Sequence, residues 1–211
     1  MSEIIDSKNL LLQINNGNKE NVVLDIGCGA NKKSIQHIGI DMLKIENVDI
    51  VGEVLEVLNC IKDSKVDKIF TSHFLEHIDD LEKYLQEFSR VLKPNGALII
   101  KVPHFSNPYY YSDPTHKIFF GLYTLSYFCD CSFLRRTVPK YNHLIQFDIE
   151  KINLNFSSTR PFYIRHAFKK VIGFIFTSSY YMQEFWEENL SSIIPCYCLL
   201  YTSPSPRDAT L

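Results

Sequence analysis

Short apolar runs of strand length recur along the first half of the chain, and segments of helical period separate them. Leu81, Leu85, Phe88 and Leu92 recur at helical spacing, and a second helix is expected over residues 53–61. The expected strands are residues 22–26, 35–40, 48–51, 66–71 and 97–102. Alternating strands and helices predict an α/β fold whose mostly parallel, doubly wound sheet binds its ligands at the carboxyl ends of the strands.

Polar residues at the ends of these segments indicate where the expected helices and strands begin and end. Asp79 is predicted to cap the helix over residues 81–92, with Glu82 three residues later, and residues 93–96 are predicted to end it in a turn. The strand at residues 66–71 is expected to be buried on both faces of the sheet. Only a vestigial helix fits between the first two strands.

The pattern changes after Pro103. Residues 104–120 form a long loop rich in aromatic side chains, followed by an expected short helix at residues 122–129 and an alternating strand at residues 146–155. Apolar residues over residues 164–176 follow helical spacing, with basic residues on the other side. This amphipathic helix either docks its apolar stripe on the domain or contacts a membrane surface or an acidic partner.

The end of the first strand indicates a nucleotide-binding turn. Gly27 and Gly29 allow a sharp turn and a close approach of ligand to backbone. In the dinucleotide-binding fingerprint a third glycine opens the following helix, whereas this chain has Lys32 there, and Asp25 stands at the strand tip. A carboxylate at this point disfavours a pyrophosphate and suits a cationic ligand with an ammonium and a sulfonium group. Asp41, at the tip of the second strand, can accept both hydroxyl protons of a ribose.

Five ordered stretches resemble the class I S-adenosylmethionine-dependent methyltransferases. They are VVLDIGCGAN with IGID, VDIVGEVLEVL, VDKIFTSHFLEHIDD, VLKPNGALIIKVPH and DPTHKIFF. The last stretch resembles a subgroup of small methyltransferases with a very short first helix. The resemblance covers residues 22–120 and implies a Rossmann-like domain that transfers a methyl group from S-adenosylmethionine.

The resemblance also implies which residues bind this donor. Gly27 and Gly29 would face its methionine part, and Asp41 its ribose. Ser72 and His73, at the end of the fourth strand, would lie where the methyl group meets the acceptor. The full expected set of cofactor-binding residues is Asp25, Gly27, Cys28, Gly29, Asp41, Met42, Glu53, Val54, Ser72 and His73, with Glu53 and Val54 at the adenine edge. Glu53 as a helix-start carboxylate and His73 as a packing residue are the alternatives, and His77 is interpreted as structural.

The aromatic loop is the expected wall of the acceptor site. His116, with Asp113 three residues before it, is a candidate general base for an oxygen or nitrogen nucleophile. Alternatively, hydrogen bonds of Asp113 and Thr115 hold the turn together, and His116 only pins the loop.

Composition narrows the class of acceptor. The chain has 22 basic and 24 acidic residues, so no basic surface indicates a nucleic-acid partner. A small molecule, a saccharide or a lipid-linked precursor is expected instead. The six cysteines lack zinc-site spacing and are expected to be reduced thiols of a cytoplasmic protein, with no metal ligand among the expected site residues. The sequence does not indicate an oligomeric state.

The last 13 residues, 199–211, resemble a translated sequencing-adaptor read and show no periodicity. We therefore expect one methyltransferase-like domain over residues 1–198, with a cofactor half at about 20–104, a substrate lid at about 104–135 and a C-terminal strand and helices at about 145–198. The final strand is expected to be truncated or replaced, and pairing of residues 199–201 as a makeshift final strand is left open.

Two other functions remain open from the sequence. The first is a nicotinamide-dependent oxidoreductase, which the missing third glycine and Asp25 disfavour. The second is a binding module that holds S-adenosylmethionine without turnover.

Overall fold

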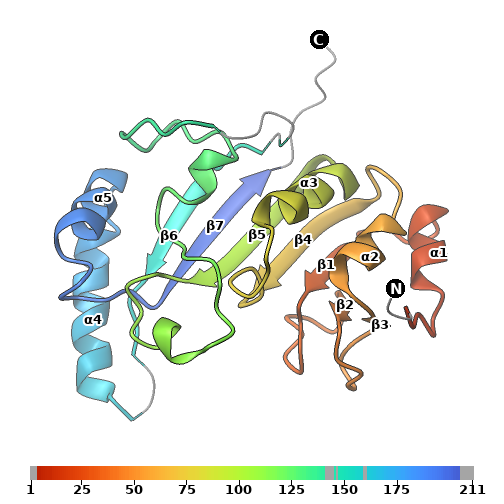
Figure 1. Cartoon of the computed structure of the whole chain (residues 1–211), viewed down its shortest axis with the longest axis horizontal. Coiled ribbons are helices and arrows are strands. Elements are labelled where there is room, and N and C mark those ends of the chain that lie inside the picture. Colours follow the sequence, from red (N-terminus) through yellow and green to blue (C-terminus); the bar gives the residue numbers. More distant parts are fainter. Residues whose placement is uncertain (1–3, 141–144, 146, 159–160, 205–211) are drawn as a thin grey trace.

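The computed structural model describes residues 4–140, 145, 147–158 and 161–204 and contains one seven-stranded mixed sheet (Figure 1). The strand order is β3-β2-β1-β4-β5-β7-β6, with β1 to β5 parallel and β7 antiparallel to both of its neighbours. The strands are β1 Val23–Ile26, β2 Ile38–Asp41, β3 Ile50–Val51, β4 Val66–Ser72, β5 Leu92–Pro103, β6 Lys151–Asn155 and β7 Cys198–Pro204. The predicted α/β fold with a doubly wound, mostly parallel sheet is confirmed.

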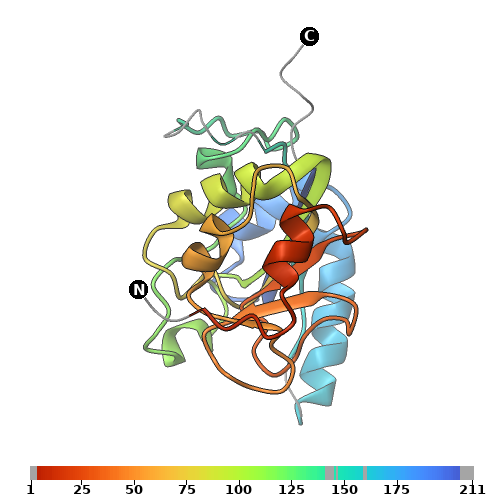
Figure 2. The same ribbon diagram turned by 90° about the vertical axis from the view of Figure 1, so that its right-hand side faces the viewer.

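Five α-helices and two short 3₁₀ turns accompany the sheet in the described residues. Helices α2 and α3 cover one face, whereas α4 lies on the opposite face (Figure 2). The helices are α1 Leu10–Asn15, α2 Val54–Asn59, α3 Leu81–Val91, α4 Tyr163–Phe176 and α5 Tyr180–Asn189, and the 3₁₀ turns are η1 Tyr110–Ser112 and η2 Leu125–Tyr127. Within the described residues, no helix has both the length and the apolar character needed to cross a bilayer.

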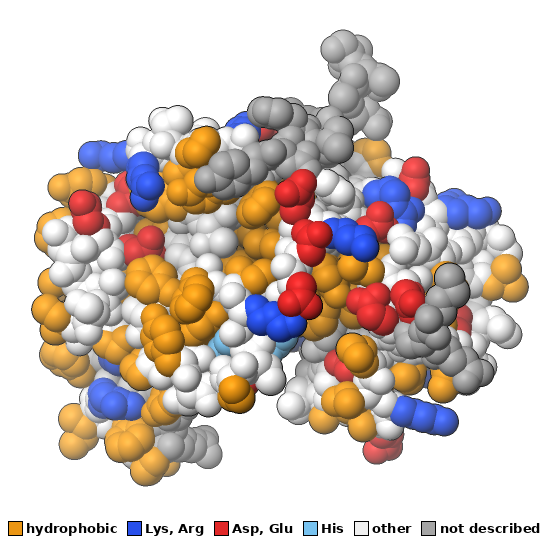
Figure 3. All heavy atoms as spheres, viewed as in Figure 1, with side chains coloured by type: hydrophobic (Ala, Val, Ile, Leu, Met, Phe, Trp, Pro, Cys, Tyr) orange, Lys and Arg blue, Asp and Glu red, His pale blue; other side chains and the backbone are white. Residues whose placement is uncertain are grey.

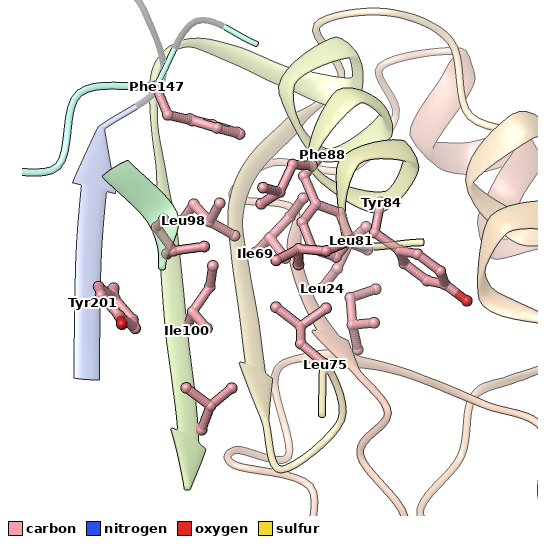
Figure 4. Packing of buried hydrophobic residues seen from close by; sticks show 14 of the residues in the cluster. Leu24, Ile69, Leu75, Leu81, Tyr84, Phe88, Leu98, Ile100, Phe147 and Tyr201 are labelled. Carbon is pink, nitrogen blue, oxygen red and sulfur yellow. The ribbon is translucent and has the colours of Figure 1, made fainter. Parts of the chain in front are cut away.

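The core lies between the sheet and α3. Leu24 of β1 and Ile69 of β4 lie beneath the helix, which presents Leu81 and Phe88 to them, and Leu98 of β5 belongs to the same cluster (Figure 4). All five side chains are buried, so removing this helix would return a large apolar area to water. This packing fixes the carboxyl ends of β1 and β4 side by side, at the point where the strand order reverses. Such a switch point is where open α/β sheets bind ligands.

Several local boundaries differ from those expected. The cap of α3 is Asp80, whose carboxylate accepts a hydrogen bond from the Lys83 amide, while Asp79 pairs with Lys117 instead. The expected helix at residues 122–129 is only the 3₁₀ turn η2. Of the expected strand at residues 146–155, residues 151–155 form β6, and Gln146 lies outside the described residues.

The expectation that β4 is buried on both faces is wrong. Lys68 is exposed and Phe70 is only half-buried, with the Lys33 ammonium 5.5 Å from the centre of the Phe70 ring. No helix forms between β1 and β2, where only a vestigial helix was expected, and none forms between β2 and β3. Without those helices, this face of β4 stays open to solvent.

The chain after residue 198 differs most from expectation. Leu199 and Tyr201 are buried in β7, which pairs with β5 on one side and β6 on the other. Ser203, also buried, donates a hydrogen bond to the Asp148 carbonyl. Excluding residues 199–204 from the fold was therefore wrong, and the domain extends at least to Pro204. Residues 205–211 lie outside the described residues.

Helix α4 docks only part of its apolar stripe on the domain. Gly173 is its one buried residue and packs against Phe156, where a Cβ would approach the ring closely. Ile172 and Phe176 are partly buried against the core. The stripe residues Ile164, Phe168, Val171 and Ile175, and Phe174 beside them, are exposed.

Candidate active site

The glycine turn after β1 has the geometry that its sequence predicts. Gly27 and Gly29 have φ angles of +64° and +51°, in the left-handed region that favours glycine. A Cβ at Gly27 would lie 2.4 Å from Phe74, so the turn packs tightly against the segment after β4. A Cβ at Gly29 would meet no atom within 4 Å. One side of the turn is therefore closed by protein, and the other is open to a ligand.

Asp25 and Cys28 lie beside this turn and are both buried. The carboxylate of Asp25 accepts a hydrogen bond from the Lys33 amide at 2.6 Å. Burial raises the pKa of Asp25, although this hydrogen bond and the charges of His37 and Lys32 act in the opposite sense. Burial, with the neighbouring carboxylates, also raises the pKa of the Cys28 thiol to about 12. A cationic ligand group would stabilise the ionised form of Asp25.

Asp41, at the end of β2, ties the turn to the second strand. One carboxylate oxygen accepts a hydrogen bond from the Gly29 amide at 2.8 Å, and the other accepts one from the Leu43 amide at 2.9 Å. Each oxygen keeps a lone pair for a further donor, so two neighbouring hydroxyl groups can bind there. Met42 and Leu43 are exposed beside it and provide an apolar surface.

Glu53 acts as the carboxylate at the start of a helix, the alternative to a role in binding the cofactor. One of its oxygens accepts a hydrogen bond from the Glu56 amide and caps α2, while the other accepts one from the Tyr84 hydroxyl at 2.9 Å. Burial and the Glu53 charge raise the pKa of Tyr84 above its usual range. Val54 follows as a buried core residue. Contact of Glu53 and Val54 with an adenine stays a prediction.

These residues fit the methyl donor that the resemblance implies. The open side of Gly29 leaves room for a ligand against the backbone, and Asp25 and Asp41 supply negative charge to a cationic, ribose-bearing molecule. Residues 25–29 would hold its amino-acid part, and Asp41 with Met42 its nucleoside. When bound, the donor supplies an electrophilic methyl group, and the protein must orient it and keep water away.

The end of β4 brings further polar groups to the same edge of the sheet. Ser72 ends the strand, and His73 follows with a φ of +56°, an uncommon value for histidine. The Nδ1 atom of His73 lies 3.3 Å from an oxygen of Glu76, and its Nε2 atom lies 3.6 Å from the Cys198 sulfur. Contact of Ser72 and His73 with the donor stays a prediction.

The DPTH turn, residues 113–116, lies against this strand end. Its Thr115 hydroxyl donates a hydrogen bond to Asp113 at 2.6 Å, and the His77 Nδ1 atom lies 2.8 Å from the same hydroxyl. His116 bonds through Nδ1 to the Tyr110 carbonyl at 2.9 Å, and its ring lies 4.8 Å from that of His77. Two histidines distant in sequence therefore meet at the acceptor side of the expected site.

Asp113 does not orient the candidate base His116 through a hydrogen bond. Its Nε2 atom is 3.7 Å from Asp113, which instead accepts hydrogen bonds from the hydroxyl and the amide of Thr115. These two bonds lower the pKa of Asp113. The alternative, a turn held together by hydrogen bonds between Asp113 and Thr115, is therefore present. A catalytic role for His116 with Asp113 stays a prediction.

A cavity of about 370 Å³ separates the aromatic loop from α4. Tyr109 lines it from the loop, and Arg165, Phe168 and Lys169 line it from the helix. Burial lowers the pKa of Lys169, whose ammonium donates a hydrogen bond to the Pro195 carbonyl at 2.8 Å. The cavity therefore combines an aromatic wall with two basic side chains.

Glu76 and Cys198 lie beside His73 and were not among the expected site residues. Glu76 is completely buried, and its backbone carbonyl accepts hydrogen bonds from the amides of Lys117 and Ile118 in the loop. The signal for Glu76 was present in the sequence SHFLEH, where a carboxylate directly follows two apolar residues and lies in one short segment with two histidines. No local signal indicates Cys198, because it reaches His73 only through the pairing of β7.

Comparison with known proteins decides between the possible classes. A family described as the methyltransferase domain matches residues 2–147, more than half of the chain. This chain belongs to the methyltransferase-domain family. The expected enzyme class, an S-adenosylmethionine-dependent methyltransferase, is thereby confirmed, and the oxidoreductase alternative loses its support.

Solved structures agree in fold with this methyltransferase. An S-adenosylmethionine-dependent methyltransferase from Archaeoglobus fulgidus has a TM-score of 0.55 at 19% identity, with 92% of each chain covered. The YcgJ protein from Bacillus subtilis has a TM-score of 0.53 at 18% identity, with 95% of this chain and 98% of that one covered. The [4+2]-cyclase SpnF also matches, with a TM-score of 0.53 at 16% identity over 94% of this chain and 79% of that one. Because a cyclase has this fold too, the fold alone does not specify the reaction.

Proposed function

We propose that this methyltransferase transfers the methyl group of S-adenosylmethionine to a small-molecule, saccharide or lipid-linked acceptor that carries an anionic group. The observation that carries the donor assignment is the turn after β1, where the space beside Gly29 is open and the carboxylates of Asp41 and Asp25 accept hydrogen bonds from the Gly29 and Lys33 amides. A dinucleotide would place a pyrophosphate next to these carboxylates, which disfavour it.

The acceptor is proposed to enter from the side of the aromatic loop. The cavity between Tyr109 and α4 supports an anionic acceptor, because Arg165 and Lys169 line it without a carboxylate among the lining residues. Its aromatic wall suits the apolar face of a sugar or an acyl chain. His116 and Asp113 are proposed to lie at the acceptor end of the same loop.

The exposed side chains of α4 support the lipid-linked branch of this proposal. Ile164, Phe168 and Phe174 are exposed on a helix that also carries Arg165 and Lys170 (Figure 3 shows apolar side chains on the surface of this region). Apolar and basic side chains on one helix favour an anionic lipid surface. Cosedimentation with vesicles containing phosphatidylglycerol tests this branch, with neutral phosphatidylcholine vesicles as the control.

Parallel calorimetric titrations with S-adenosylhomocysteine, NAD and NADP test the donor assignment. We expect S-adenosylhomocysteine alone to bind. Binding of NAD or NADP in its place would contradict the proposal. Incubation with methyl-labelled donor and candidate acceptors then separates an enzyme from a module that binds the donor without turnover.

A further inference from the structure

Three side chains with metal-binding atoms come together at the carboxyl end of β4. Glu76 and His77 follow this strand, and His116 reaches them from the DPTH turn. One ligand atom from each residue lies within 4.8 Å of the other two. Ligands around a tetrahedral zinc ion, each about 2.0–2.1 Å from it, are about 3.4 Å apart, so small side-chain rotations would close the site.

Glu76 supplies a carboxylate without a hydrogen-bonding partner. The side chain is 1% exposed, and neither carboxylate oxygen has a hydrogen bond to the described residues. Its nearest charged or titratable neighbours are His73, with Nδ1 at 3.3 Å, and His77, with Nε2 at 4.0 Å. A buried carboxylate is costly unless a cation or hydrogen-bond donors compensate it. A metal ion at this point would provide that compensation.

The two histidines are oriented as metal ligands are. The Thr115 hydroxyl gives its proton to Asp113, so it can only accept from Nδ1 of His77. The Tyr110 carbonyl likewise accepts from Nδ1 of His116. In both neutral rings the lone pair is therefore on Nε2. Metal-binding histidines usually donate their other ring N–H to an oxygen in this way.

We propose that Glu76, His77 and His116 bind a divalent first-row transition-metal ion of the zinc type, with positions left open toward the acceptor. Two imidazoles and one carboxylate suit zinc, cobalt or iron, whereas magnesium prefers an all-oxygen site. The His77 side chain is 34% exposed, so solvent reaches this ligand, whereas the Glu76 side chain is 1% exposed. The space-filling view shows histidine side chains beside an indentation at the lower edge of the molecule (Figure 3).

The ion gives the reaction a route without a general base, a consequence that rests on the proposed function. An acceptor hydroxyl bound to the ion has a lowered pKa and releases its proton to water. Its oxygen then forms a bond to the methyl carbon while the carbon–sulfur bond breaks, and the electron pair stays on sulfur. In this arrangement Nε2 of His116 binds the ion and takes no proton.

Metal binding can be measured without donor or acceptor. We would titrate chelator-treated full-length protein with Co²⁺ and follow its visible absorption, then displace it with Zn²⁺. The Cys60→Ser variant serves as the background because Cys60 is an exposed thiol. We expect one ion per chain, with affinity at least about tenfold lower in His77→Gln and His116→Gln. His166→Gln, on α4, is the matched control and should bind as the parent does.

Thr115 distinguishes a metal site from a merely structural contact. Thr115→Val removes the hydroxyl that orients His77 and should lower Co²⁺ affinity about 10- to 100-fold, whereas Thr115→Ser should restore it. The proposal is wrong if Co²⁺ does not bind, if both histidine variants bind as the parent does, or if a thiolate charge-transfer band shows that cysteines hold the ion. Failure of the parent protein to bind S-adenosylhomocysteine would instead overturn the proposed function and leave the metal site standing.

Discussion

The part of the sheet around β1, β2 and β4 and the part around β7 differ in how much of their structure can be predicted from short stretches of sequence. In β1, β2 and β4, the polar residues that form the expected donor site lie within a few residues of a strand end. In the C-terminal part, the strand that completes the sheet, β7, lies between β5 and β6 and includes residues whose sequence shows no periodicity. The comparison indicates that the donor side is built from local turns and the acceptor side from contacts between distant segments.

The largest effect is expected from removing β7. Truncation after Cys198 exposes the edges of β5 and β6 and removes the buried side chains of Leu199 and Tyr201. Loss of one large buried side chain costs about 3 to 5 kcal/mol, so we expect the free energy of unfolding to fall by more than about 5 kcal/mol. Thermal and denaturant unfolding measure this change. Deletion of residues 205–211, which keeps all of β7, is the control, and an unchanged midpoint after the longer truncation would show that β7 contributes nothing.

Thiol reactivity compares the two regions directly. Burial raises the pKa of both Cys28, in the donor half, and Cys129, in the C-terminal half, to about 12. Since only the thiolate reacts, alkylation at pH 8 should be roughly a thousandfold slower than at an ordinary thiol and should rise with pH. Exposed Cys60 is the internal reference. Peptide mass spectrometry after iodoacetamide treatment gives the rates.

The same assay separates the donor site from the rest of the molecule. S-adenosylhomocysteine should slow the labelling of Cys28 further and leave Cys129 unaffected. Equal protection of both cysteines would indicate a global change in stability and not a ligand at the turn after β1.

Asp41 provides the next largest expected effect. Asp41→Ala removes the acceptors proposed for the ribose, so S-adenosylhomocysteine should bind about 1.5 to 3 kcal/mol more weakly, the range for hydrogen bonds to a charged group. The variant also frees the amides of Gly29 and Leu43, so thermal unfolding must be measured alongside calorimetry. Asp63→Ala, which removes an exposed carboxylate, is the matched control. Full affinity in Asp41→Ala would remove this residue from the site.

The smallest effect is expected on the exposed part of α4. Phe174 is 82% exposed, so Phe174→Ser should change the free energy of unfolding by no more than about 0.5 kcal/mol. Phe176→Ser, at a residue packed against the core, should be clearly more destabilising. A loss of stability in Phe174→Ser equal to that in Phe176→Ser would mean that the helix buries its whole apolar stripe.

Sequence patterns correctly predicted the helices and strands that depend on residues close together in the chain. The helix at residues 163–176 was expected over residues 164–176, and the strand ends at Asp41 and Ser72 lie at or within one residue of their expected positions. Helical period and turn-forming glycines act over a few residues, so one sequence contains them in full. The cap of α3 at Asp80 in place of Asp79 shows the usual uncertainty of one residue at a helix end.

The predictions of burial for β4 and α4 differ from the structure because burial depends on which segments pack against an element. Whether Lys68 faces a helix or water depends on the segments between β1 and β3, which form no helix. Whether α4 buries its stripe is decided by the size of the surface beneath it. Periodicity shows that a helix has an apolar side and does not show how much partner surface exists.

The sequence by itself determined the class of fold, the turn of Gly27 and Gly29 and the carboxylates beside it, because these follow from backbone freedom and charge over short distances. Only the tertiary structure decided that Glu76, His77 and His116 meet, and that Leu199 and Tyr201 are buried in a strand between β5 and β6. Their partners come from segments far apart in the chain. Such pairings form when the whole chain buries its apolar surface, and no short stretch of sequence specifies them.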